Sequence, residues 1–203
     1  MADDNAANKW RPATNLVRGG TNRSNFAETS EGIFMTSGYI YDTAEQAQRA
    51  FQGEEERFIY SRFSNPTVGM FESRMALLEG AATGRATSTG MAAVNAAIAS
   101  SVRSGDRLVA SKALFGSCDY ICRDLMPRYG VQSTMVDGTN LAEWEAALSE
   151  PTAVVFMETP SNPQMDIIDI KAVSELAHKV GARVIIDNVF ATPILQKPLE
   201  LGA

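Results

Sequence analysis

Asp187 is the residue of this 203-residue sequence whose type and position could most directly do chemistry. It follows Val184-Ile185-Ile186, a continuous apolar run that is typical of a strand covered on both faces of a sheet. Parallel α/β sheets bind ligands at the carboxyl ends of their strands, where Asp187 would lie. A carboxylate there is poorly solvated unless it meets a cation. The protonated pyridine nitrogen of pyridoxal 5′-phosphate (PLP) is such a cation, and the pattern points to it.

A candidate phosphate site is the turn Thr87-Ser-Thr-Gly-Met91, between a predicted short strand and a predicted helix. Gly90 lets a ligand approach the backbone closely, and a helix N-terminus offers free N–H groups and the positive end of its dipole. A tight turn of this kind also needs glycine without any ligand, so both interpretations stay open. The sequence has no GxGxxG or GxxxxGK[ST] motif, so those nucleotide-binding loops are not indicated.

Tyr60 and Arg62 form a second candidate phosphate contact. They are two residues apart, so in an extended segment both side chains point the same way. The arginine fork is permanently charged and binds phosphate through two hydrogen bonds. The alternative is a surface turn with a solvated arginine, which this motif alone favours.

Phe115 and Asn162 also follow predicted strands. Phe115 could stack on a planar cofactor, or it could be an ordinary core aromatic. Asn162 lies in Glu158-Thr-Pro-Ser-Asn-Pro163, where two prolines stiffen the loop, and its amide can donate to a phenolate-like oxygen. The alternative for this loop is a simple proline turn.

These candidates need a common scaffold, and the sequence predicts alternating strands and helices for it. The predicted strands are 86–88, 107–111, 131–136, 153–157 and 184–186, and the predicted helices are 91–101, 117–129, 140–149 and 169–180. Such alternation favours a mostly parallel sheet with helices on both faces, that is, a three-layer α/β fold. Gly90, Phe115, Asn162 and Asp187 would all lie at carboxyl ends of successive strands, around one site.

The first part of the chain has a different character. Residues 1–60 lack strong periodicity, and we expect an extended N-terminal arm with short helical pieces such as 43–51, and a disordered tail over 1–9. A helix is predicted from Pro66 to Gly80, with Val68, Phe71, Met75 and Leu78 at helical spacing. The predicted domains are therefore an arm, 1–60, for oligomer contacts and a large domain, 61–203.

Composition excludes several classes of protein. The net charge is −6 and no basic stripe occurs, which argues against nucleic-acid binding. No apolar stretch approaches the ~20 residues of a membrane helix, and the acidic start is unlike a secretory signal. Cys118 and Cys122 are the two cysteines, and with His178 as the single histidine they predict free thiols in a reducing cytoplasm and no metal site.

Four motifs between residues 60 and 193 together resemble the Cys/Met-metabolism family of PLP enzymes. The motifs are Tyr60-Ser-Arg with Asn65-Pro-Thr, Ser88-Thr-Gly-Met91, Glu158-Thr-Pro-Ser-Asn-Pro163 and Asp187-Asn-Val-Phe-Ala-Thr-Pro193. These cystathionine γ-synthase-like enzymes have the aspartate aminotransferase fold (fold type I). Leu114-Phe-Gly-Ser-Cys118 and the arm Trp10-Arg-Pro-Ala-Thr-Asn-Leu-Val-Arg-Gly-Gly20 narrow the resemblance to members that act on O-succinylhomoserine with sulfide.

The resemblance implies a role for each matched residue. Asp187 would bind the pyridine nitrogen, and the backbone of Gly90 and Met91 would bind the phosphate. Phe115 would stack on the ring, Asn162 would bond the ring hydroxyl oxygen, and Glu158 would stand behind the cofactor. Of the remaining matches, Tyr60 and Arg62 would reach the phosphate of a neighbouring subunit.

The implied reaction is a γ-replacement in methionine biosynthesis, in a cytoplasmic homotetramer built from dimers that share active sites. O-succinylhomoserine and sulfide would give homocysteine and succinate. O-acetylhomoserine as substrate, cysteine as nucleophile, or γ-elimination remain alternatives.

The sequence departs from the family pattern in two ways. Many members have tyrosine where Phe115 stands, and phenylalanine has no hydroxyl for proton transfer, which disfavours a γ-lyase. The Schiff-base lysine of a Ser-x-Thr-Lys motif and the smaller C-terminal domain are both absent from the sequence. We therefore expect the front half of a protein of about twice this length. Lys112, the one lysine at the end of a predicted strand, is expected to be solvated. A non-catalytic fragment of the fold is the alternative.

Overall fold

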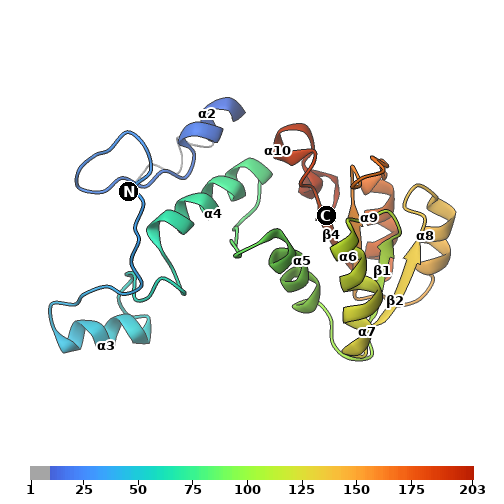
Figure 1. Cartoon of the computed structure of the whole chain (residues 1–203), viewed down its shortest axis with the longest axis horizontal. Helices are drawn as coiled ribbons and strands as arrows, with labels where there is room; N and C mark the ends of the chain where they lie inside the picture. Colours follow the sequence, from blue (N-terminus) through green and yellow to red (C-terminus); the bar gives the residue numbers. More distant parts are fainter. Residues whose placement is uncertain (1–9) are drawn as a thin grey trace. The chain divides into compact units, whose positions relative to one another are not determined.

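The computed structural model describes residues 10–203, so the tail expected over residues 1–9 lies outside the described residues. The chain forms two compact units, Met1–Ala86 and Thr87–Ala203 (Figure 1). The first unit contains three helices in its described part, and the second contains the sheet. The assignment of residues 1–60 to oligomer contacts and of residues 61–203 to the large domain stays a prediction.

A four-stranded parallel sheet organises the second unit. Its strands are β1 (Arg107–Ser111), β2 (Gln132–Val136), β3 (Val154–Glu158) and β4 (Arg183–Asp187), in the order β2-β1-β3-β4. All three pairings are parallel, as predicted from the alternation of strands and helices. Glu158 and Asp187 are register partners at the carboxyl ends of β3 and β4, so the last residues of these strands lie side by side.

Helices cover both faces of this sheet. Alternate strand residues such as Leu108 and Phe156 pack on one face against α5 (Gly90–Ala99), α6 (Gly116–Tyr120) and the segment that continues α6. Val109 and Val155 pack on the opposite face against α8 (Leu141–Ala147) and α9 (Ile170–Lys179). Figure 1 shows α6 and α8 on opposite sides of the strands. The predicted three-layer α/β fold is confirmed.

The helix predicted over 117–129 is interrupted. α6 continues as a π-helical stretch (Ile121–Leu125) and then as the short helix α7 (Met126–Arg128). Within this stretch the N–H of Met126 donates to the carbonyl of Ile121, five residues back. Pro127 explains the wider turn, because proline has no N–H for the residue four positions back and its ring would clash with that carbonyl.

One expectation about strands was wrong. Residues 86–88 do not form a strand, because the N–H of Ala86 donates to the side chain of Glu72 (2.8 Å) and Thr87 donates to the carbonyl of Thr89 (2.7 Å). β4 is the last strand of the sheet among the described residues, and it is covered on both faces as expected: Ile185 packs against the cluster on one face, and Val184 and Ile186 against the cluster on the other. Ile185 and Ile186 are only half-buried.

Capping side chains define three of the helix starts in the second unit. Thr89, Asn140 and Asp169 accept hydrogen bonds from backbone N–H groups in the first turns of α5, α8 and α9. Gly181, at φ 76°, follows α9 in the left-handed conformation that ends a helix, as predicted. The unit ends with α10 (Thr192–Leu195) and a 3₁₀ turn (Pro198–Leu201).

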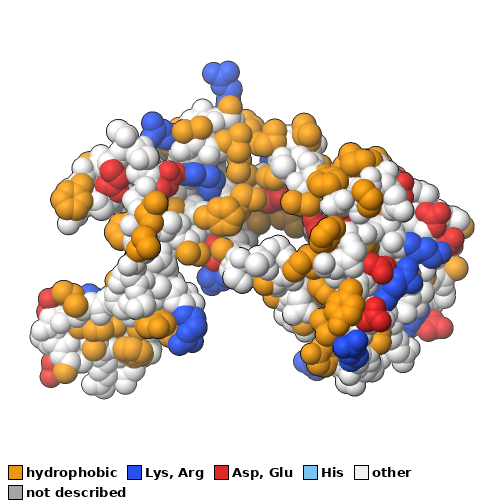
Figure 2. Space-filling view, in the orientation of Figure 1, with side chains coloured by type: hydrophobic (Ala, Val, Ile, Leu, Met, Phe, Trp, Pro, Cys, Tyr) orange, Lys and Arg blue, Asp and Glu red, His pale blue; other side chains and the backbone are white. Residues whose placement is uncertain are grey.

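The first unit has three described helices: α2 (Pro12–Arg18), α3 (Ala44–Gln52) and α4 (Pro66–Glu79). The predicted helices at 43–51 and 66–80 are thus confirmed. Asn65 caps α4 by accepting from the N–H groups of Thr67 and Val68. Few side chains of this unit are buried, and Figure 2 shows apolar side chains at the surface around α3.

No helix in residues 10–203 is long and apolar enough to cross a membrane.

Candidate active site

A cavity of about 630 Å³ opens beside the carboxyl ends of β3 and β4 in the second unit. It contains six of the eight residues selected from the sequence. These are Gly90, Met91, Phe115, Glu158, Asn162 and Asp187. Side chains from α5 and β4 complete the apolar part of its wall, together with Val189 and Phe190 from the loop after β4.

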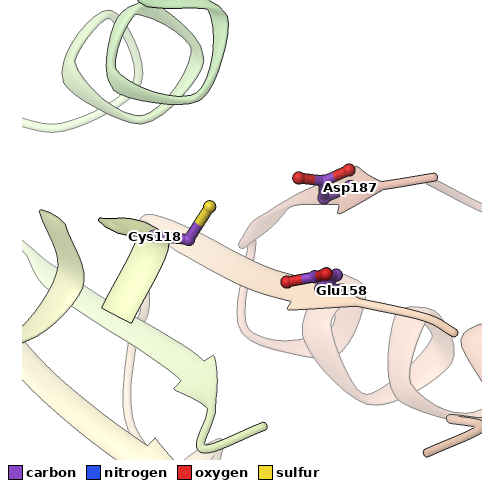
Figure 3. Close-up of side chains that lie close together, drawn as sticks. All are labelled: Cys118, Glu158 and Asp187. Atoms are coloured by element: carbon purple, nitrogen blue, oxygen red, sulfur yellow. The ribbon is translucent and has the colours of Figure 1, made fainter. Parts of the chain in front are cut away.

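Asp187 and Glu158 bring two carboxylates to one side of this cavity. They are the last residues of adjacent strands, and Figure 3 shows their side chains next to each other. Asp187 is half-buried and accepts a hydrogen bond from the N–H of Val189 (3.1 Å), which fixes one of its oxygens. Among the described residues, no Lys or Arg forms an ion pair with either carboxylate. The site therefore offers negative charge to a cationic ligand group.

Glu158 is 1% exposed, and both of its oxygens accept backbone hydrogen bonds. Oε2 accepts from the N–H of Phe115 (2.6 Å) and Oε1 from the N–H of Asn162 (2.9 Å). Burial is the largest influence on the pKa of Glu158 and raises it, and the neighbouring Asp187 raises it further, against the opposing effect of the two N–H donors.

The N-terminus of α5 faces the same cavity. Thr89 caps the helix by accepting from the N–H of Ala92 (3.0 Å), and the N–H of Ala93 bonds the carbonyl of Thr89. The N–H groups of Gly90 and Met91 bond no acceptor in the described part of the chain. A side chain added at Gly90 would meet no protein atom within 4 Å. The helix thus presents two free donors to open space, which suits an anion.

Phe115 and Asn162 reach the cavity from loops after β1 and β3. The ring of Phe115 is 44% exposed, so it is available for stacking and is not the core aromatic of the alternative reading. Asn162 lies between two prolines, and the Thr159–Pro160 and Asn162–Pro163 peptide bonds are both cis. The amide of Asn162 is half-buried against the cavity.

Cys118 belongs to this site although the sequence did not predict it there. Its Sγ and carboxylate oxygens of Glu158 and Asp187 all lie within 4.8 Å of one another (Figure 3). Burial, followed by the two carboxylate charges, raises the pKa of the Cys118 thiol to about 12. The thiol is therefore protonated at neutral pH. The available signal was its place three residues after Phe115, at the start of the helix predicted over 117–129.

Tyr60 and Arg62 lie in the first unit, and their segment is not extended as expected. The carbonyl of Tyr60 accepts from the N–H groups of Phe63 (2.8 Å) and Ser64 (3.2 Å), which makes a turn. The Arg62 guanidinium nevertheless lies over the Tyr60 ring, 5.4 Å from its centroid. The phenol and the guanidinium are thus neighbours through the turn rather than through a strand.

Lys112 does not line this cavity. Its Nζ lies 3.3 Å from Oε2 of Glu143, and it borders a separate polar pocket with Asp137 and Asp166. The exposed pair agrees with the expectation of a solvated lysine.

A parallel sheet with helices on both faces and an anion-and-cation site at its carboxyl edge defines a class of α/β enzyme domains that bind phosphorylated cofactors. The Cys/Met metabolism PLP-dependent enzyme family matches residues 13–203, and the chain belongs to this family. The cofactor of the family is PLP.

The relatives cover several activities. The chain is 53% identical over 190 residues to an O-succinylhomoserine sulfhydrylase of Mycobacterium tuberculosis. That match covers 94% of this chain and 47% of the relative. It is 42% identical over 192 residues to an L-methionine gamma-lyase of Porphyromonas gingivalis, covering 94% of this chain and 48% of the relative. The chain spans about half the length of the curated relatives that it matches.

Solved structures show the same fold. The metB structure from Corynebacterium glutamicum superposes with a TM-score of 0.88 at 30% identity, covering 97% of this chain and 50% of that one. A putative O-acetylhomoserine (thiol)-lyase from Campylobacter jejuni, which carries N'-pyridoxyl-lysine-5'-monophosphate, also has a TM-score of 0.88 at 30% identity. It covers 96% of this chain and 48% of that one. The predicted fold type I domain is confirmed.

The residues present fit PLP. The free N–H groups of α5 suit its phosphate, and the Asp187 carboxylate suits its pyridinium nitrogen. The exposed ring of Phe115 offers a stacking surface.

Proposed function

We propose that the protein catalyses a PLP-dependent γ-replacement in which O-succinylhomoserine and sulfide give homocysteine and succinate. The observation that carries the proposal is the placement of Asp187 and the free α5 N–H groups around one cavity. When bound, PLP supplies an electron-accepting ring that stabilises negative charge on substrate carbons. This is a transferase reaction of the transsulfuration type, in methionine biosynthesis.

Asp187 is proposed to accept the N–H of the pyridinium nitrogen and so to keep that nitrogen protonated. A carboxylate in a half-buried site, fixed by the Val189 N–H, favours the cationic form of the ring next to it. Glu158 adds a second negative charge beside Asp187. Protonation of the ring is what makes it an electron acceptor, so Asp187 has the largest effect on rate.

The phosphate is proposed to bind at the N-terminus of α5, on the backbone of Gly90 and Met91. Tyr60 and Arg62 are proposed to add a phenol and a guanidinium to a phosphate in a neighbouring subunit. The contact between their side chains supports a shared role, because the ring holds the guanidinium without neutralising it.

Phe115 is proposed to stack on the cofactor ring, and Asn162 to donate to the ring hydroxyl oxygen. Phenylalanine has no ionisable hydroxyl, so proton transfers cannot use this position. Many family members have a tyrosine at this position. Its absence here argues for γ-replacement over the γ-lyase activity for which several relatives are named.

The choice of substrate follows the relatives with higher identity. O-succinylhomoserine sulfhydrylases match at 53% and 43% identity, and methionine gamma-lyases at 38–42%. O-acetylhomoserine with sulfide and O-succinylhomoserine with cysteine are the competing reactions.

The first test uses the protein expressed at the full length of its coding sequence. Asp187→Asn keeps the size and hydrogen-bonding shape of the side chain but removes its charge. We expect folding and PLP uptake to persist while turnover falls by orders of magnitude. Asp124→Asn, the same change at an exposed position of the π-helical stretch, is the matched control and keeps wild-type turnover. Wild-type turnover in Asp187→Asn would overturn the proposed role.

The second test separates the candidate reactions. O-succinylhomoserine and O-acetylhomoserine are each offered with sulfide, with cysteine and with no nucleophile, and homocysteine, cystathionine and 2-oxobutyrate are measured. We expect the highest kcat/KM for O-succinylhomoserine with sulfide. A preference for cysteine, or release of 2-oxobutyrate as the main product, would replace the proposal with the corresponding alternative.

The proposed assembly is a cytoplasmic homotetramer of dimers, in which the first unit supplies subunit contacts. Large exposed apolar side chains such as Phe26 and Met35 support it, because such groups at this density usually mark an interface. Light scattering of the full-length protein tests it, and a monomer would contradict it.

The alternative is a non-catalytic protein of the same fold. Borohydride reduction followed by intact-mass measurement decides it. A full-length chain that gains one reduced PLP supports the enzyme, and a full-length chain with no adduct supports the non-catalytic alternative.

A further inference from the structure

Glu158 occupies an unusual position for a carboxylate. It is 1% exposed at the end of β3, beside another carboxylate, and no lysine or arginine in residues 10–203 forms an ion pair with it. A buried carboxylate without a cation costs free energy of folding, and an apolar or amide side chain would be less costly. Its presence is therefore better explained by a role in the site than by stability.

The hydrogen bonds of Glu158 show what that role could be. Its two oxygens accept from backbone N–H groups of two separate loops, at Phe115 after β1 (2.6 Å) and at Asn162 after β3 (2.9 Å). These two residues supply the ring and the amide that face the cavity. One carboxylate thus joins the two loops, and its own place is fixed by the register of β3 with β4, where Asp187 is its partner.

The connection to Phe115 is the more constrained of the two. The carbonyl of Phe115 accepts from the N–H groups of Cys118 (2.8 Å) and Asp119 (3.0 Å), so the residue begins α6. Its N–H donates to Glu158 on the other side. The backbone of Phe115 is therefore held at both ends, which fixes the point from which its ring extends into the cavity.

We propose that Glu158 is a positioning residue that fixes the Phe115 ring and the Asn162 amide relative to Asp187. It acts through their backbone N–H groups and needs no contact with the cofactor. The inference rests on the proposed function, because it takes Phe115 and Asn162 as the groups that bind the cofactor ring.

The chemistry of the clamp requires a carboxylate. Both oxygens of Glu158 are acceptors, whereas glutamine has one acceptor oxygen and an NH₂ group that only donates. Glu158→Gln can therefore keep one of the two bonds, and Glu158→Ala keeps none. Glu143→Gln is the matched control, because Glu143 also accepts a backbone N–H (Asp137, 2.8 Å) but lies outside the cavity.

The test compares these variants in the full-length protein, first without cofactor. Backbone amide exchange is followed by NMR at Phe115 and Asn162, where loss of a hydrogen bond should accelerate exchange about tenfold. We expect acceleration at one of the two amides in Glu158→Gln, at both in Glu158→Ala, and at neither in Glu143→Gln. Near-ultraviolet circular dichroism checks that Glu158→Gln, which changes the side chain least, is folded.

The same proteins are then titrated with PLP. We expect Kd to rise about tenfold in Glu158→Gln, with a shifted absorption maximum of the bound cofactor, while Glu143→Gln matches the wild type. Unchanged exchange at both amides in Glu158→Ala would overturn the clamp. Faster exchange with wild-type Kd and spectrum would also overturn the inference, because the clamp would then be structural only. If the wild type bound no PLP, the proposed function would fail. The amide exchange rates, measured without cofactor, would still show whether Glu158 holds the two loops.

Discussion

The two units of the chain use their apolar side chains in opposite ways. The unit Thr87–Ala203 buries them in two clusters, one on each face of its sheet, and Phe156 and Trp144 are at most 1% exposed. The described part of the unit Met1–Ala86 buries few, and Phe26 is 92% exposed there. The difference teaches that the second unit has a core of its own, whereas the described part of the first leaves most of its large apolar side chains exposed.

The residues selected from the sequence are divided between the two units. Six of the eight lie in the second unit and line its cavity, where strand ends and helix starts fix them. Tyr60 and Arg62 lie in the first unit, in a turn. The contrast between the two units predicts three differences, and a fourth prediction concerns Glu158 within the second unit; their expected effects decrease in that order.

The largest contrast should be in thiol chemistry. Burial raises the pKa of Cys118 and of Cys122 to about 12, from an ordinary 9.0, so the thiolate fraction falls about a thousandfold. We expect native labelling by an electrophile at pH 8 to be slower than in urea by at least that factor. In a background where both cysteines are serine, Glu54→Cys in the first unit should label within seconds. Fast labelling of the native wild type would show that the second unit opens readily.

The next largest difference should be in the stability lost when a large apolar side chain is truncated. Phe156→Ala removes a side chain that is 1% exposed, and we expect it to lower the free energy of unfolding by about 3–5 kcal/mol. Phe26→Ala in the first unit should change it by no more than about 0.5 kcal/mol. Urea unfolding followed by circular dichroism measures both. A large loss of stability in Phe26→Ala would mean that the exposed ring of Phe26 contributes to the stability of the first unit.

Removing a helix cap should have a smaller effect on the free energy of unfolding, and here the larger loss should fall in the first unit. Asn65 accepts from two N–H groups of α4, and its Nδ2 donates to the carbonyl of Phe34 and to Ser61. Asn65→Ala should therefore cost about 2 kcal/mol. Asn140→Ala, which removes one capping bond from α8, should cost about 1 kcal/mol. Equal losses in urea unfolding would mean that the extra bonds of Asn65 contribute nothing.

The smallest effect should be a pH dependence at Glu158. Its pKa is raised above the ordinary 4.5, so the folded protein binds this proton more tightly than the unfolded chain. The resulting contribution to stability is complete below pH 4.5 and is lost as the pH rises through the folded pKa. Cofactor-free wild type should therefore lose stability relative to Glu158→Gln from pH 4.5 towards neutrality. Parallel urea curves that keep a constant difference would contradict the raised pKa.

The sequence predicted the sheet well because its strands are short apolar runs with clear ends. The strands at 107–111, 131–136, 153–157 and 184–186 all appear within about two residues of their predicted bounds. The run at 86–88 failed because three residues carry too little pattern, and because Ala86 bonds a side chain from α4 instead of a neighbouring strand.

The site was predictable as a set of strand ends but not as a network. Asp187, Phe115 and Asn162 could be placed because each follows a predicted strand. The bonds of Glu158 could not, because Phe115 is 43 residues away in the chain and its donor is a backbone N–H that every residue has. Cys118 was predicted only to be a free thiol, without any sign that two carboxylates would lie beside it.

The protonated state of Cys118 has a consequence for a pocket proposed to receive sulfide. Polysulfides, which accompany sulfide wherever it is partly oxidised, convert cysteine to a persulfide by reacting with its thiolate. A thiol with a pKa of about 12, flanked by two negative charges, offers almost no thiolate at neutral pH and repels anionic sulfur species. The two carboxylates that favour a cation in the pocket therefore also protect the Cys118 thiol from reaction with polysulfides.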